Sequence, residues 1–111
     1  MPRVEPTFEE RLEVALGEAR DLLERGLDFE AHEVLEPVWL EASGESRRWL
    51  QGVIQFAASG HHLRSGRERA ARLVAARASE RLADAPEHWH GFPLGRVARA
   101  ATRRAVGLET G

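Results

Sequence analysis

The fold is decided by residues 29–39, FEAHEVLEPVW, in which apolar side chains recur every three or four residues. This spacing predicts one face of an amphipathic α-helix. On a helical wheel His32 and Glu36 fall inside the stripe that also holds Phe29, Leu35 and Trp39. An unpaired polar group costs roughly 1–3 kcal/mol when it is buried. We therefore expect His32 and Glu36 to be buried, and to pair with each other or with a shared water.

Helical periodicity continues on both sides of this stretch, and no segment has the alternation of a β-strand. Thr7 followed by Glu10 is a capping-box pattern that places the start of the first helix. Pro37 lacks an N–H and should kink the second helix. The predicted fold is a single all-α domain over residues 1–111. It is a bundle of about five helices, the second and third forming a central αα-hairpin. The predicted helices span about residues 8–25, 28–42, 46–65, 67–84 and 94–106.

Composition predicts a soluble globular protein, since 42% of the 111 residues are hydrophobic and 31% are charged. No apolar run approaches the roughly 20 residues of a membrane span, and the first residues carry no apolar signal core. The expected location is the bacterial cytoplasm, without membrane association. Cysteine is absent, which excludes disulfides and thiolate metal sites. All 16 basic residues are Arg, and Asn is absent as well, a pattern typical of GC-rich codon use and of thermophiles.

Charge is divided unevenly along the chain. Residues 1–45 hold 13 acidic side chains and 4 Arg, whereas residues 46–111 hold 5 acidic side chains and 12 Arg. The halves could pack side by side, or the basic half could bind anions or nucleic acid. Nucleic acid is the less favoured partner, because no aromatic or Gly-rich RNA motif accompanies the Arg residues. The same division favours a homodimer in which opposite charges meet twice about a two-fold axis. The anion-binding candidates are Arg96, Arg99, Arg103 and Arg104, on the last predicted helix.

A polar cluster is predicted between the second and third helices. In an antiparallel hairpin His32 lies near the end of the third helix, where His61 and His62 follow each other. The cluster could be a structural hydrogen-bond network, or a metal site, because imidazole and carboxylate suit zinc, iron or manganese. Metal-free catalysis or binding of a small ligand is the third alternative. A divalent transition metal is the one cofactor considered. The predicted polar cluster comprises His32, Glu33, Glu36, Gln51, Gln55 and His62, and the candidate metal ligands are His32, Glu36, His61 and His62.

No catalytic motif is complete, so no catalytic residue is assigned. HEVLE, residues 32–36, has Glu where the zinc-peptidase motif requires its second His. The chain contains a single Glu-x-x-His pair, Glu87 and His90, in a predicted connection, whereas the di-iron bundles need such a pair on each of two helices. HWH, residues 88–90, places two His two apart in a connection, which is a weak metal pattern. Its Trp89 is more simply explained as part of the core.

Residues 29–66, FEAHEVLEPVWLEASGESRRWLQGVIQFAASGHHLRSG, resemble a family of small bacterial helical proteins known as domain of unknown function 309. The resemblance rests on an aromatic-Glu-Ala-His-Glu-x-x-Glu-x-x-Trp helix followed by a Leu-Gln-Gly-x-Ile-Gln helix that ends in His and Gly. It continues through the Ala/Arg helix and implies an all-α fold without an assigned activity. The positions that match are Phe29, His32, Glu33, Glu36, Trp39, Leu50, Gln51, Gly52, Ile54, Gln55 and His62.

Three functional hypotheses follow. The favoured one is a non-enzymatic binding or scaffold module, because every catalytic motif is incomplete. The second is a metal-binding protein or metal-dependent enzyme centred on His32 and Glu36. The third is anion or nucleic-acid binding through the Arg-rich second half.

Overall fold

A computed structural model describes residues 4–107, and in that range it contains α-helices and no β-strand. The predicted all-α class is confirmed. The observed helix bounds lie within three residues of the predicted ones; the largest difference is at the end of the fourth helix. The helices are α1 (Phe8–Glu24), α2 (Asp28–Glu41), α3 (Gly44–Arg64), α4 (Glu68–Arg81) and α5 (Leu94–Ala105).

Helix α1 begins at the capping box that the sequence predicts. The Glu10 backbone N–H donates to Thr7 Oγ1, and the Thr7 backbone N–H donates to Glu10 Oε1, each over 3.1 Å. The hydrogen bond that the Thr7 backbone N–H donates to the Glu10 carboxyl, together with the nearby Thr7 side chain, lowers the pKa of Glu10. At the other end Gly26 adopts a left-handed φ of 74°, which turns the chain into α2. Local signals therefore fix both ends of this helix.

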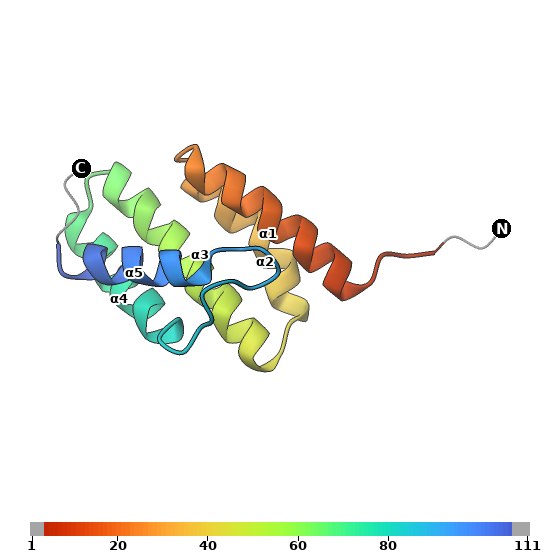
Figure 1. The fold of residues 1–111 in the computed structure, drawn as a ribbon. Coiled ribbons are helices and arrows are strands. Elements are labelled where there is room, and N and C mark those ends of the chain that lie inside the picture. Colours follow the sequence, from red (N-terminus) through yellow and green to blue (C-terminus); the bar gives the residue numbers. More distant parts are fainter. Residues whose placement is uncertain (1–3, 108–111) are drawn as a thin grey trace.

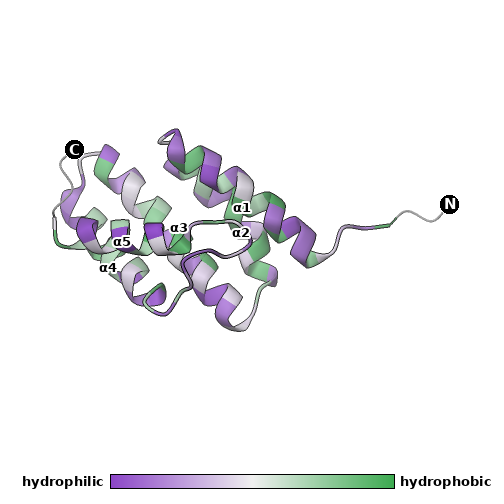
Figure 2. Cartoon of the chain, viewed as in Figure 1, coloured by the Kyte–Doolittle hydropathy of each residue, from purple (hydrophilic) through white to green (hydrophobic). Residues whose placement is uncertain are grey.

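The helices pack in chain order around α3. Helix α3 lies between α2 on one side and α4 on the other, while α1 covers α2 and α5 covers α4 (Figure 1). The predicted α2–α3 hairpin is present. Along each helix apolar residues recur among hydrophilic ones (Figure 2), as expected where only one face is buried. The largest fully buried side chains are Leu12, Leu16, Leu35, Leu50, Val53, Leu82, Phe92 and Leu94.

An ion pair between a buried Asp28 and an exposed Arg64 closes one end of the α2–α3 hairpin. The Asp28 side chain is 8% exposed, and its Oδ2 accepts a 2.7 Å hydrogen bond from Arg64 Nε. A Cβ at position 60 would lie 2.6 Å from this oxygen, so Gly60 is what allows the approach. A capping role for Asp28 is not observed, because Leu27 is the N-cap and makes no side-chain capping bond. Asp28 instead joins α2 to the end of α3.

Pro37 lies inside α2 without splitting it. Both Pro37 and Glu33, whose carbonyl loses its usual N–H partner, are on the exposed side of the helix. Water can therefore hydrate that carbonyl, and the helix continues to Glu41.

The connection between α4 and α5, residues 82–93, reaches across to α1. Trp89 and Phe92 exchange two backbone hydrogen bonds of 2.9 and 2.8 Å around a tight turn. His90 and Gly91, at the centre of that turn, have φ values of 50° and 76°, the signature of a type I′ turn. The His90 ring nitrogens lie 3.2 Å from a Glu9 oxygen and 3.1 Å from a Glu13 oxygen. The connection thus fastens the C-terminal half of the bundle to α1.

Candidate functional site

His32 and Glu36 lie at the edge of α2 rather than in the core. Their side chains are 34% and 50% exposed, and His32 Nε2 lies 3.5 Å from Glu36 Oε2. They face each other as predicted, but the prediction that both are buried is wrong. The buried residues of α2 and its C-cap are Asp28, Ala31, Leu35, Val38 and Ala42. At about 100° per residue their centre is roughly 80° away from His32.

Aromatic rings extend this surface onto α3. The Phe29 ring is 6.3 Å from the His32 ring and 5.7 Å from the His61 ring, measured between centroids. Phe29 is itself 48% exposed. The two His therefore lie on either side of a half-exposed aromatic ring, and they do not share a buried site.

The other members of the predicted polar cluster face in different directions. Gln55 Oε1 accepts a 2.9 Å hydrogen bond from Arg81 of α4. His62 Nδ1 accepts a 3.0 Å bond from Arg67, and Glu33 is exposed on the α1 side of α2. Gln51 is only partly buried. The structure does not assemble these residues into one network, because α3 presents them to α4 and to solvent as well as to α2.

The candidate metal ligands are not grouped either. Within residues 4–107 no three His, Asp or Glu side chains are arranged to hold a metal ion. In the HWH stretch His88 is exposed, while His90 contacts the two carboxylates of α1. Metal binding at His32 and Glu36 stays a prediction, and elemental analysis of untagged protein would test it.

Trp39, the last residue of the motif helix, has a buried and unpaired donor. Its indole Nε1 makes no hydrogen bond to the described part of the chain. The Arg47 guanidinium lies over the ring at 4.5 Å from the centroid. Trp39 therefore packs the far end of the α2–α3 hairpin through a cation–π contact.

The four anion-binding candidates on α5 separate into two groups. Arg99 donates two hydrogen bonds to Glu87, of 2.9 and 2.6 Å, and these lower the pKa of the carboxyl. Arg104 points inward and donates to Ser59 Oγ over 2.8 Å, with its guanidinium 4.4 Å from the Phe56 ring centroid. Arg96 and Arg103 are exposed, and neither forms an ion pair with another residue in the range 4–107. Of the four candidates, only Arg96 and Arg103 are thus both exposed and without an acidic partner among residues 4–107.

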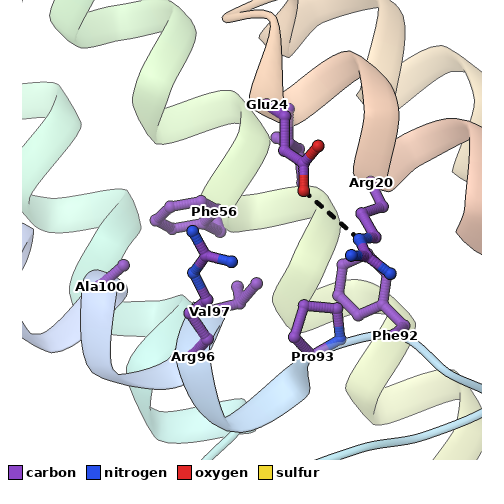
Figure 3. A pocket seen from close by; sticks show the side chains of 9 residues that line it. Arg20, Glu24, Phe56, Phe92, Pro93, Arg96, Val97 and Ala100 are labelled. Atoms are coloured by element: carbon purple, nitrogen blue, oxygen red, sulfur yellow. Dashed lines mark hydrogen bonds and ion pairs between the residues drawn. The ribbon is translucent and has the colours of Figure 1, made fainter.

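A small pocket of about 180 Å³ opens between α1, α3 and α5 (Figure 3). Phe56, Phe92 and Val97 are among the apolar residues that line it, and Arg96 extends from α5 toward Phe56. Arg20 lies on the opposite side, 3.3 Å from Glu24. The pocket combines an apolar lining with the guanidinium group of Arg96, which has no acidic partner among residues 4–107.

A wider groove of about 510 Å³ follows the outer side of the α1–α2 hairpin. Val14, 61% exposed, contributes apolar surface to it. Arg11 and Glu41 form an ion pair at one end, which lowers the pKa of Glu41. The groove is acidic along its rim and apolar inside; its lining includes Glu10, Val14, Glu18, Glu33, Val34 and Pro37.

Comparisons with known proteins give the family. The model of domain of unknown function 309 (DUF309) matches residues 16–74. The chain belongs to the DUF309 family. The matched range runs from the middle of α1 through α2 and α3 into α4, so it contains the whole α2–α3 hairpin. The DUF309 resemblance seen in the motif residues is therefore confirmed.

Two relatives of this DUF309 chain carry no assigned activity in their names. An uncharacterized protein of Aquifex aeolicus (strain VF5) is 30% identical over 95 residues, covering 85% of this chain and 28% of that protein. This chain thus spans little more than a quarter of that relative. The crystal structure of a conserved hypothetical protein from Thermus thermophilus is similar, with a TM-score of 0.72 and 40% identity. That match covers 82% of this chain and 95% of the other. No helix within residues 4–107 is long and apolar enough to span a bilayer.

The sequence interpretation missed Asp28, Gly60 and Arg64 as a unit. The sequence does contain a signal for this unit. In an antiparallel hairpin, an Asp at the start of one helix lies close to an Arg at the end of the following helix. The glycine at position 60 marks the point where the Asp28 side chain of α2 comes close to the backbone of α3. This unit fixes the hairpin that presents Phe29, His32 and His61 together.

Proposed function

We propose that this DUF309 protein is a non-enzymatic binding module, and that the outer groove of the α1–α2 hairpin receives a basic amphipathic helix from its partner. The observation that carries the proposal is the exposed row Glu10, Val14 and Glu18 on α1. These residues are spaced four apart and so lie on one helix face. We call them the α1 stripe. In the α1 stripe an apolar side chain is flanked by two carboxylates. It is complementary to a partner helix on which an aliphatic side chain is flanked by two cationic side chains.

The groove has the form that helix recognition needs. Val34 and Pro37 from α2 lie across from Val14, so an incoming aliphatic side chain would meet apolar surface from both helices. Amphipathic helices commonly bind by placing an apolar face in such a groove. Glu18 and Glu33 would contribute charge pairing at its rim, which sets orientation and association rate more than affinity.

A non-enzymatic role is supported by how the ionisable groups are distributed. His32, Glu36 and His61 lie on open surface rather than in a pocket. The pocket lined by Arg96 contains Glu24, but that carboxylate is paired with Arg20. Among residues 4–107 no acid, base and nucleophile converge at one cavity.

Fluorescence anisotropy with a synthetic helical peptide tests the proposal. The probe carries Arg, Leu and Arg at positions i, i+4 and i+8, and a scrambled peptide of the same composition is the control. Glu18→Arg combined with Glu33→Arg should weaken binding by about tenfold, at up to about 1 kcal/mol for each exposed pair. Glu30→Arg, an exposed acid outside the groove, should leave it unchanged. Equal affinity for the scrambled peptide, or no binding at low salt, contradicts the proposal.

A second candidate function is supported by Arg96 at the α1–α3–α5 pocket. We propose that the pocket holds a small organic anion whose apolar part occupies the lining and whose carboxylate pairs with Arg96. An apolar cavity of roughly 150 Å³ is large enough to bind benzene, so about 180 Å³ admits one ring. Arg20 is only loosely held by Glu24 in an exposed pair, and such pairs contribute little.

Residue-resolved NMR with phenylacetate, phenylacetamide and acetate distinguishes this function from general anion binding. Phenylacetate should shift the amide signals of residues 92–100, with a Kd on the order of 1 mM. The neutral amide and acetate should bind more weakly. Arg96→Gln should weaken phenylacetate binding by about tenfold, whereas Arg103→Gln should not. Glu24→Gln removes the carboxylate that competes for Arg20, and it should strengthen phenylacetate binding. Equal binding of acid and amide refutes the assignment.

A further inference from the structure

The outer face of α4 carries the chemical counterpart of the α1 stripe. Arg69, Leu73 and Arg77 are spaced four apart, and all three are exposed, Leu73 by 56%. We call them the α4 stripe. Neither Arg69 nor Arg77 forms an ion pair within residues 4–107. Helix α4 therefore presents an exposed leucine between two guanidinium groups that have no acidic partner in this range. This is the kind of basic amphipathic face that the α1–α2 groove should bind.

We infer that a partner of the α1–α2 groove is a second copy of this chain, which docks through its α4 stripe. The inference rests on the proposed function, and it names the occupant of the same groove. In each stripe eight residues separate the two charges, which is about 12 Å at 1.5 Å per residue. When Leu73 of one copy meets Val14 of the other, both Arg reach a Glu at the same time.

The two stripes cannot pair within one chain. Helix α1 packs on α2 at one side of α3, while α4 packs on the opposite side (Figure 1). Each chain therefore presents a complementary acidic and basic surface to other copies. A two-fold axis would form the contact twice and close a dimer, whereas another arrangement would join chains head to tail.

The association is expected to be weak and dependent on salt. Stable protein interfaces bury about 1,200–2,000 Å², and one stripe of about 12 Å supplies only part of that area. Exposed ion pairs contribute up to about 1 kcal/mol each and are screened at high ionic strength. The full chain should thus self-associate at low salt, and dissociate as the salt concentration rises.

Sedimentation velocity of complementary variants tests the inference. The first variant, Glu10→Arg with Glu18→Arg, makes both stripes basic; the second, Arg69→Glu with Arg77→Glu, makes both acidic. Each variant alone should self-associate at least about tenfold more weakly than the natural chain. An equimolar mixture should associate again, because each stripe then meets its opposite. Asp21→Arg with Glu30→Arg is the matched control outside the stripes and should behave as the natural chain does.

The outcomes separate this inference from the proposed function. Natural chain that stays monomeric at low salt overturns self-association, while binding of the Arg-Leu-Arg peptide would still uphold the groove. Self-association that persists in both variants, or a mixture that does not associate, also overturns it. Because Glu10 belongs to the capping box, thermal unfolding must show that the first variant is folded. Glu18→Arg alone keeps that box and should weaken association in the same direction.

Discussion

Replacing Gly60 by Ala should destabilise the protein, although Ala is the better helix former. A Cβ at position 60 would lie 2.6 Å from Asp28 Oδ2 and 2.7 Å from Asp28 Cγ. The carboxylate would have to move, and it would lose its 2.7 Å bond to Arg64 Nε. A hydrogen bond to a charged group contributes about 1.5–3 kcal/mol, and the exposure of Arg64 lowers that value. Overpacking adds about 1–3 kcal/mol, and the helix propensity of Ala returns up to about 1 kcal/mol.

The net loss in the free energy of unfolding should be about 2 kcal/mol. Urea unfolding followed by circular dichroism measures it. Gly17→Ala is the matched control, because a Cβ there would meet no side chain or neighbouring helix of the described residues within 4 Å, and it should stabilise by up to about 1 kcal/mol. In an Asp28→Ala background the cost of Gly60→Ala should shrink, because the atom it meets is gone. An unchanged cost in that background, or no cost in the natural chain, would refute the reasoning.

Three further predictions concern separate contacts. The hydrogen bonds from Arg99 hold the pKa of Glu87 below its usual value. The stabilisation that these bonds give is complete above the pKa of Glu87 in the unfolded state, and it is lost as pH falls through the lower pKa of the folded state. The Tm should therefore fall when the pH is lowered below about 4, and it should fall less in Glu87→Gln. Arg104→Met should destabilise by about 1–2 kcal/mol in urea unfolding, because two hydrogen bonds are lost, whereas Arg103→Met should change stability by less than about 0.5 kcal/mol. His90→Val should lower the Tm more than His90→Asn does, because a β-branched residue tolerates a φ of 50° poorly while Asn adopts it readily; equal Tm values for the two variants would contradict that reason.

The helices could be predicted from the sequence because their signals are local. Thr7 and Glu10 cap α1 by contacts three residues apart, and Gly26 turns the chain directly after it. Periodicity of 3.6 residues supplied the rest. Such signals depend on neighbouring residues alone, so they do not require knowledge of how the helices pack.

The buried face of α2 could not be predicted in the same way. Phe29 and Trp39 drew the predicted stripe toward His32, yet small aliphatic residues such as Ala31 and Val38 form the buried face. A helix wheel ranks side chains by hydrophobicity, whereas burial also depends on which face lets two helices approach closely. For α2 that face is the one on which Asp28 meets Gly60.

The inward turn of Arg104 was also beyond local signals. Its partners, Ser59 Oγ and the Phe56 carbonyl, lie 45 and 48 residues away in sequence. The guanidinium could be assigned to the interior only once α5 was placed against α3. Arg96 and Arg103 on the same helix stayed outside, so residue type alone did not distinguish the three.

The reach of the 82–93 connection to α1 has a consequence for folding kinetics. Most contacts in the bundle join helices that are consecutive in the chain, and such local contacts form quickly. The contact of His90 with Glu13 spans 77 residues, so closing it requires a much longer loop. It should therefore form after the transition state, and His90 variants should mainly speed unfolding while leaving the refolding rate nearly unchanged. The turn at His90 and Gly91 would then form late in folding, and its contacts with α1 would set the unfolding rate of the native bundle.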